Sequence, residues 1–456
     1  MGGNIMRVRG LLVMGCVVAL AAACTEGSAG EAGTTTTAST STEPPSTASV
    51  GTDAADTTVV DDGSLVAQFA GQPWAFGTMP AGATPADPSA EPIVIGIINQ
   101  EDTPVGSFPE IRHAVEAAVG WINAELGGVQ GRPIELVECI TNFSVEQSQA
   151  CAQKMVQANA VAVISGIDIT ATGSLPVLEQ NGIPLVSAVP TTLAELRSNA
   201  TFSFSGGITG AYIAFVADAH AKGATSIAIA YGDFESFSVP ATDYAAKVAE
   251  QLGMEVTLIP FPLTTTDYLP VIQAAIGSGA GAITVAAADT ACVPLMNTIH
   301  DLGYTGRTYV VGACAAEQIL AQVADDVQAP IIFNAEGPPD PGIEGDLFLG
   351  ATERYVTEAA GGAGTVGFRA AMNLWGAMNG IEGDVTSAAI IDAFRSGRDR
   401  PSFWGHPYTC DGKQVPGMPA LCSPQQTLFR LPDDAGTLVA ESDGWIDVPA
   451  LAAGLG

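Results

Sequence analysis

The residues most capable of chemistry in this chain are its eight cysteines, which stand at positions 16, 24, 139, 151, 292, 314, 410 and 422. The first two fall in an apolar N-terminal segment, and the other six form an even set of near-sequence pairs. No C-x-x-C motif and no tight Cys/His cluster accompanies them, so the spacing does not favour a metal site. Because the N-terminus has the features of an export signal, the pattern predicts disulfides.

Other catalytic constellations are not apparent in the sequence. The four histidines are widely scattered, and none stands in a metal-binding spacing such as H-E-x-x-H. The sequence also lacks a G-x-S-x-G elbow and a Walker loop, and among its 52 glycines a stray glycine-rich match carries little weight as a dinucleotide fingerprint. We therefore expect no enzyme activity, no cofactor and no metal.

The charge of the chain limits its partners. Asp and Glu number 48 against 16 Lys and Arg, which gives a formal net charge of −32. A field of that sign repels nucleic acid and anionic lipid headgroups. The simplest interpretation is that acidity keeps an exported protein soluble, and the alternative is that it steers a cationic ligand.

The N-terminus predicts export and a lipid anchor. Arg7 and Arg9 precede the apolar segment 11–23, which is too short for an ordinary membrane span and predicts a signal peptide over residues 1–23. The small residues before Cys24 resemble a bacterial lipoprotein signal, in which that cysteine is lipidated. Leu20 lies four residues before Cys24, whereas that pattern usually has three, so cleavage and secretion without a lipid is the alternative.

The next segments predict a tether and a lead-in. Residues 24–60 are rich in Thr, Ser, Ala and Gly and lack large apolar groups, so they predict a disordered tether. Residues 61–91 predict an irregular lead-in, because Trp74 and Phe76 could pack on the body while four prolines oppose regular structure. No later apolar run is long enough for a second membrane anchor.

From residue 92 the chain alternates between short β-branched runs and amphipathic segments. Such alternation predicts parallel sheets with helices on both faces, and two successive series predict two similar α/β lobes. Ligands in such sheets lie beyond the carboxyl ends of the strands. The predicted strands are 93–98, 134–137, 161–164, 184–187, 226–231, 255–258, 282–286 and 308–311, and the main predicted helices are 114–126, 145–158, 211–223, 241–252, 268–278 and 293–302.

Four stretches carry a resemblance to a known family. Residues 122–134 read INAELGGVQGRPI after the first predicted helix, and residues 163–166 and 182–187 read VISG and GIPLVS. Residues 301–306 read DLGYTG, and the two cysteines Cys139 and Cys151 form the fourth stretch. The chain resembles the type I periplasmic-binding family, specifically the branched-chain amino acid and amide binding proteins of ABC importers. The resemblance covers about residues 92–430.

The resemblance implies two doubly wound parallel-sheet lobes joined by three crossings of the chain. It places lobe 1 at 92–207 plus 336–398 and lobe 2 at 208–335 plus 399–456, with crossings near 206–207, 335–337 and 401–405. Glycines at these places suit segments that absorb backbone rotation as lobes close.

The resemblance also implies ligand contacts from lobe 1. Thr170 and Thr191 are the expected hydroxyl contacts, with Ser187 in the same loop as Thr191 and Phe108 before the first helix. Asp168 departs from the family pattern and would repel a carboxylate or recognise a cation. The alternative for both threonines is a plain helix cap.

On lobe 2 the resemblance implies an aromatic cover and an acid. Phe237, or Ser236 in a strict count, takes the aromatic position, with core packing as the alternative. The family's ammonium-binding acid position is Cys314 here, and Asp289 becomes the replacement unless it caps a helix. The loss of the usual acid leaves the ligand unnamed. The implied disulfides are Cys139–Cys151, Cys292–Cys314 and, in lobe 2, Cys410–Cys422.

These observations predict an extracytoplasmic, lipid-anchored solute-binding protein, acting as a monomer. It would capture a small polar solute, such as an amino acid or an amide, and deliver it to ABC permease subunits. One alternative is a sensor that signals its bound state to a membrane receptor, and a hydrolase on the same scaffold is the less favoured one.

Overall fold

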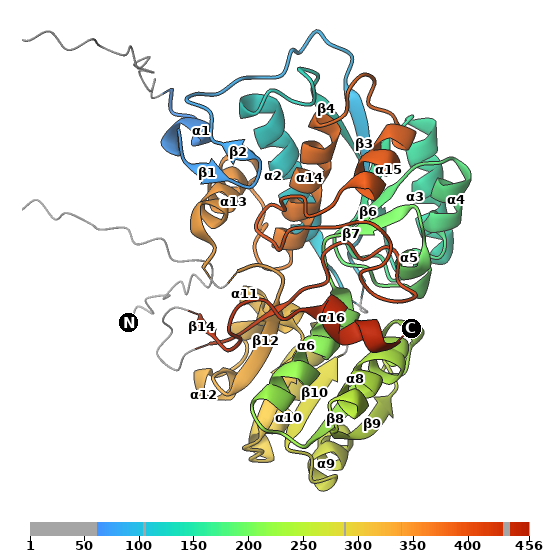
Figure 1. Ribbon diagram of the computed structural model, residues 1–456, viewed down its shortest axis with the longest axis vertical. Helices are drawn as coiled ribbons and strands as arrows, with labels where there is room; N and C mark the ends of the chain where they lie inside the picture. The colour runs from blue at the N-terminus through green and yellow to red at the C-terminus, as the bar shows by residue number, and fades with distance from the viewer. Residues whose placement is uncertain (1–61, 104–105, 287–288, 339, 432–437, 456) are drawn as a thin grey trace, which may run out of the picture.

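The computed structural model describes residues 62–103, 106–286, 289–338, 340–431 and 438–455. The predicted signal peptide, tether and Cys24 lie outside these residues. Two α/β lobes stand one above the other, each built around its own sheet (Figure 1). In the described ranges no helix has both the length and the apolar character needed to cross a bilayer.

Lobe 1 contains a five-stranded, all-parallel sheet in the order β4-β3-β5-β6-β7. Strand β3 is almost wholly buried, as its β-branched sequence predicts for a strand covered on both faces. The strands of this sheet are β3 (Ile93–Gln100), β4 (Ile134–Thr141), β5 (Ala162–Ser165), β6 (Leu185–Ser187) and β7 (Thr201–Ser203).

Helices cover both faces of this sheet. On one face α2 packs against α13 and α14, and on the other α3 packs against α4. Separate apolar clusters lie beneath the two layers, one around Trp121 and Phe368 and the other around Met155 and Leu178. The helices of lobe 1 are α2 (Pro109–Glu125), α3 (Val145–Gln157), α4 (Ser174–Gln180), α5 (Leu193–Arg197), α13 (Gly342–Tyr355), α14 (Gly364–Asn379) and α15 (Ser387–Ser396).

Lobe 2 contains a seven-stranded sheet in the order β14-β13-β12-β11-β10-β8-β9. The strands from β8 to β12 run parallel, whereas β13 and β14 pair antiparallel at one edge. Its strands are β8 (Ser226–Gly232), β9 (Glu255–Phe261), β10 (Ala282–Ala286), β11 (Arg307–Val310), β12 (Ile331–Ala335), β13 (Thr427–Arg430) and β14 (Val439–Ala440).

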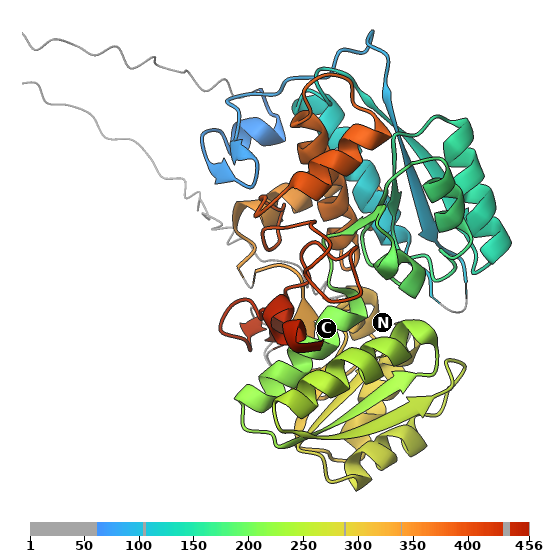
Figure 2. The ribbon, with the colours of Figure 1, turned by 45° about the vertical axis from the view of Figure 1, so that its right-hand side comes forward.

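The helices of lobe 2 also lie on both faces of their sheet (Figure 2). Helix α6 is buried on nearly all sides, which agrees with its scarcity of charged residues. The elements are α6 (Gly207–Ala221), α7 (Glu235–Val239), the π-helix η1 (Pro240–Ala245), α8 (Ala246–Gln251), α9 (Leu269–Gly277), η2 (Asp289–Ala291), α10 (Cys292–Asp301), η3 (Gly312–Ala315), α11 (Glu317–Leu320), α12 (Asp325–Gln328), α16 (Val448–Ala452) and η4 (Ala453–Leu455).

The lead-in to lobe 1 is more regular than the sequence predicted. It forms α1 (Leu65–Gln68) and a short antiparallel pair, β1 (Pro73–Trp74) with β2 (Gly77–Thr78). The ring of Trp74 lies 5.8 Å from that of Trp121 and 6.0 Å from that of Trp375. These aromatic contacts attach the lead-in to lobe 1, and the prolines limit its strands to two residues each.

The chain returns to lobe 2 later than the sequence predicted. We expected the third crossing near residues 401–405, but Phe403 and Tyr408 are buried in the lobe 1 core, as are Cys410 and Cys422. Cys422 also donates its backbone N–H to the carbonyl of Ser203 on lobe 1. The crossing therefore lies at 423–426, and the loop assigned to lobe 2 belongs mainly to lobe 1.

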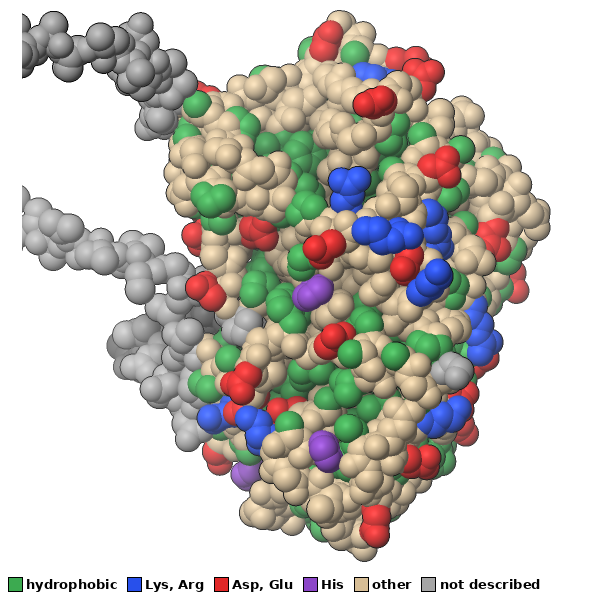
Figure 3. Space-filling model, in the orientation of Figure 1, with side chains coloured by type: hydrophobic (Ala, Val, Ile, Leu, Met, Phe, Trp, Pro, Cys, Tyr) green, Lys and Arg blue, Asp and Glu red, His purple; other side chains and the backbone are tan. Residues whose placement is uncertain are grey.

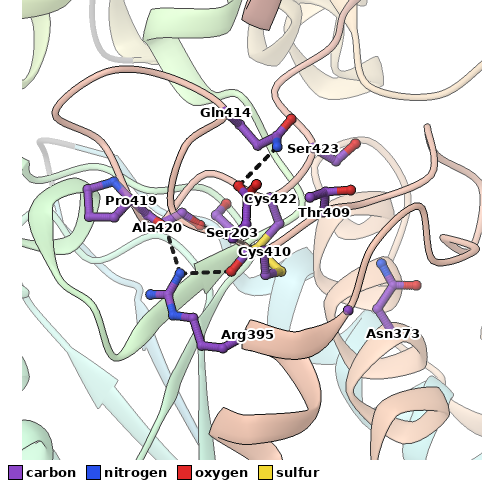
Figure 4. Close-up of a disulfide and its surroundings, with 12 residues drawn as sticks. Ser203, Asn373, Arg395, Thr409, Cys410, Gln414, Pro419, Ala420, Cys422 and Ser423 are labelled. Atoms are coloured by element: carbon purple, nitrogen blue, oxygen red, sulfur yellow. Dashed lines mark hydrogen bonds between the residues drawn. A yellow bond between two sulfur atoms is a disulfide. The ribbon is translucent and has the colours of Figure 1, made fainter. Parts of the chain in front are cut away.

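The three expected disulfides, Cys139–Cys151, Cys292–Cys314 and Cys410–Cys422, are all formed. Figure 4 shows the last of them, which closes an irregular loop on lobe 1. Arg395 on α15 donates hydrogen bonds to the carbonyls of Cys410 and Pro419, at 3.0 and 3.1 Å (Figure 4). The loop contains no named helix or strand, and the disulfide, the bonds of Arg395 and backbone hydrogen bonds such as that of Cys422 to Ser203 hold it in place.

Candidate functional site

A cavity of about 360 Å³ lies between the two lobes. Most of its wall is apolar and comes from both lobes, including loops that follow the strands, where parallel α/β folds bind ligands. Lobe 1 contributes Phe108, Ile167 and Thr191, and lobe 2 contributes Phe237 and Val311. Hydrophobic side chains also reach the surface between the lobes, while acidic ones are spread over both (Figure 3).

Three predicted site residues line this cavity. Phe108 stands immediately before α2, and Phe237 lies in α7, where the structure also brings Ser236 to the wall. Thr191 lies in the loop between β6 and α5, and its hydroxyl donates to the carbonyl of Asp168 at 2.9 Å. Their contact with a solute stays a prediction, but their position permits it.

Two other predicted residues lie behind the wall. Asp168 is fully buried and accepts hydrogen bonds from the hydroxyls of Ser148 and Thr170, both at 2.6 Å, and from the backbone N–H of Thr170. Ser187 is also fully buried, and its hydroxyl donates to Glu195 at 3.2 Å. Neither residue lines the cavity. Their geometry favours a structural role over the predicted contact with a solute.

Thr170 and Asp289 also differ from expectation. Thr170 lines a second hollow beside Phe143 and Phe234, which shares Ile169 and Ser236 with the central cavity, and does not line the central cavity itself. Asp289 begins η2, and its side chain lies outside the part of the chain that the structure describes. The family's acid position is occupied by Cys314, whose sulfur is bonded to Cys292, so this position supplies no carboxylate.

Glu195 holds the Thr191 loop from beneath. It is buried, completes a capping box with Thr192, and accepts the backbone N–H of Thr191 at 3.1 Å. Burial raises the pKa of Glu195 to about 7, and the nearby charge of Asp168 acts in the same direction. A carboxyl group that titrates near neutrality therefore supports one segment of the cavity wall.

A buried polar cluster at the three crossings was missed by the sequence reasoning. We call Ser205, Glu336, Arg369 and Gln426 the hinge cluster. Ser205 belongs to the first crossing, Glu336 to the second and Gln426 to the third, and both Ser205 and Gln426 donate to Glu336. Arg369 on α14 pairs with Glu336 at 3.3 Å. One carboxylate thus connects all three crossings.

Arg369 also holds the segment that precedes the third crossing. It donates to the carbonyls of Phe403 and Trp404 at 3.3 and 2.8 Å. Burial lowers the pKa of Arg369 and raises that of Glu336, while their mutual attraction opposes both shifts. Arg369 is the only charged residue in residues 364–379, a signal that the sequence did contain.

Trp404 is held in an unusual conformation at the cavity wall. Its φ of 43° lies in the left-handed region that bulky residues rarely adopt, and its backbone N–H donates to Glu344. The indole nitrogen Nε1 is buried without a hydrogen-bond partner. A Cβ at Gly337 would lie 3.0 Å from that nitrogen, so glycine at 337 permits the close approach of the two segments.

Within the described ranges, no group of His, Cys, Asp and Glu side chains could hold a metal ion. The charged side chains on the described wall of the cavity are Glu336 and Arg369, which neutralise one another. This arrangement can enclose a small molecule, and it presents no nucleophile paired with a base.

Two α/β lobes, connected by three crossings of the chain and separated by a mostly apolar cavity, are the architecture of a two-lobed binding protein. Residues 92–418 match the family model described as "Periplasmic binding protein", so the chain belongs to that family, in its type I form. Family membership makes it a solute-binding protein of the periplasmic type and implies a location outside the cytoplasm. Among curated proteins, none matches the chain significantly.

Solved structures share this fold at low sequence identity. A solute-binding protein from R. palustris, in complex with 4-hydroxybenzoate, has 18% identity and a TM-score of 0.66, covering 78% of this chain and 97% of its own. A leucine-binding protein from Thermotoga maritima has 17% identity and a TM-score of 0.63, covering 78% and 99%. A fatty acid transporter substrate-binding protein from Thermomonospora curvata has 17% identity and a TM-score of 0.65, covering 81% and 97%.

Proposed function

We propose that this protein captures a small organic solute in the cavity between its lobes and delivers it, chemically intact, to an ABC importer. The observation that carries the proposal is that the same cavity is lined by Phe108 and Thr191 from one lobe and by Phe237 from the other. A solute that touches both walls favours the closed arrangement through contacts that it lacks in the open one. Amino acids and amides remain candidate solutes.

The proposal includes attachment to the membrane through a lipid on Cys24. The apolar segment and the small residues before Cys24 support it. Mass spectrometry of the mature protein tests this part alone: a diacylglyceryl group on Cys24 is the expected result, and an unmodified N-terminus created by cleavage elsewhere would contradict it.

A binding screen tests the central proposal. The purified chain is heated with amino acids, amides, urea and small carboxylates, because a solute that binds only the folded state raises the unfolding temperature. Calorimetry then gives the affinity of each compound that raises it. Recovery of the compound unchanged after incubation is expected for a binding protein, and conversion to a product would instead indicate an enzyme.

One pair of variants tests whether the bound solute lies in this cavity. Phe237→Ala removes a ring from the wall and should weaken binding by about 1.5–3 kcal/mol. Phe234→Ala is the matched control, because Phe234 immediately precedes helix α7, which contains Phe237, but is 39% exposed and does not line the cavity. Equal effects from both variants would place the solute elsewhere.

A further inference from the structure

The charge balance of the cavity wall narrows the class of solute. Glu336 and Arg369 are the charged side chains among the described residues that line it, and they pair with one another at 3.3 Å. The two side chains are only 10% and 4% exposed. Glu344 lies near Arg369 but does not line the cavity, and burial raises the pKa of Glu344. The described residues of the wall therefore offer no unpaired positive charge to a carboxylate.

The uncharged polar groups of the wall are also largely engaged within the protein. Thr191 donates to the carbonyl of Asp168 and Thr427 to that of Gly337. Asn334 accepts the backbone N–H of Gly312 at 2.8 Å and donates to Gln426 at 2.8 Å. Since these donors already have partners, few besides the indole N–H of Trp404 remain for the charged ends of a zwitterion, which need several strong hydrogen bonds when buried.

We propose that the cavity selects an uncharged and mostly apolar organic solute, and that the Arg369–Glu336 pair enforces this choice by cancelling the charge that each residue would otherwise present. This inference rests on the proposed function, since it names the solute class of the same cavity. A charged solute would leave water for a wall whose described residues offer no free countercharge, whereas a neutral molecule of equal shape avoids that penalty.

Matched compounds test the inference on the unaltered protein. Benzamide and benzoate share a shape and differ in charge, as do isovaleramide and isovalerate, and leucine adds a zwitterion of similar size. Calorimetry at pH 7.5 should show the amide of each pair binding at least about 10-fold more tightly than its carboxylate. Tighter binding of a carboxylate or of leucine would overturn the inference.

A charge-switch variant tests the role of the pair. Glu336→Gln keeps the size of the side chain and leaves Arg369 without its counterion, so the preference should move toward benzoate by about 10-fold to 100-fold relative to benzamide. Glu353→Gln is the control, because Glu353 is exposed on α13 and should leave the ratio unchanged. An unchanged ratio in a folded Glu336→Gln protein would contradict the proposed role.

The wider screen separates this inference from the proposed function. Binding of another uncharged, mostly apolar compound, with no binding of charged ones, would support both. Binding of charged solutes only would overturn the inference and leave the function intact. If no compound of any class binds the chain, the proposed function itself fails.

Discussion

Removal of the Arg369 guanidinium should leave a buried carboxylate without its countercharge. In Arg369→Met, Glu336 loses its ion-pair partner, and the carbonyls of Phe403 and Trp404 each lose a hydrogen bond. Breaking a buried pair from one side costs about 3–5 kcal/mol. We expect a loss of that size in the free energy of unfolding at pH 7.5.

Part of this loss should depend on pH in a defined direction. Burial raises the pKa of Glu336, and Arg369 opposes the rise, so removing Arg369 raises that pKa further. The folded variant then keeps a proton that the unfolded chain releases above its ordinary pKa of about 4.3. A raised pKa adds stability that is full at low pH and is lost as pH rises through the folded value. The variant should therefore be least stable, relative to wild type, at neutral pH.

Urea unfolding followed by circular dichroism at pH 5 and pH 7.5 measures these effects. Adding Glu336→Gln to Arg369→Met removes the uncompensated charge and should restore about 1–3 kcal/mol at pH 7.5 but little at pH 5. Lys247→Met is the control, since the Lys247–Asp243 pair lies in solvent and should matter little at either pH. An equal loss at both pH values, or no recovery in the double variant, would refute the reasoning.

Three further predictions concern the support of the cavity and the lobes. The raised pKa of Glu195, about 7, should make the wild-type protein lose stability as the pH rises from about 4.5 to 7. In Glu195→Gln this part of the pH dependence of the unfolding free energy should disappear. Parallel pH profiles for the two proteins would contradict this prediction. Asp168→Asn should cost about 1–3 kcal/mol in urea unfolding yet leave solute affinity unchanged by calorimetry, and a large loss of affinity would return Asp168 to the site. Replacing Cys292 and Cys314 together by Ala should cost about 3 kcal/mol by the chain-entropy relation, and an unchanged unfolding midpoint would contradict that estimate.

The two sheets could be predicted because buried parallel strands leave a clear pattern. The β-branched run at the start of β3, and the alternation of strand and helix patterns after it, predicted the order of elements that the structure shows. The third crossing could not be predicted in the same way. Residues 399–426 contain no named helix or strand, and their attachment to lobe 1 depends on long-range contacts, such as the ring of Phe204 4.8 Å from that of Tyr408.

The candidate site was predictable only in part, for a related reason. A residue that follows a strand can be assigned to the binding edge from sequence, which brought Thr191 and Phe108 to the cavity. The direction of its side chain depends on local hydrogen bonds, and these turn Asp168 inward to Ser148 and Thr170. The hinge cluster joins residues from distant segments, as in the pairing of Glu336 with Arg369, so no local pattern could have predicted it.

The disulfides have a consequence for the environments in which this protein can work. Each lies within one lobe or the loop packed on it, and among the described residues none links lobe to lobe. Noncovalent contacts alone, such as those of Ser205 and Gln426 with Glu336, join the crossing segments. Oxidising surroundings can therefore stabilise each lobe against unfolding and proteolysis without adding a covalent restraint on the motion between the lobes.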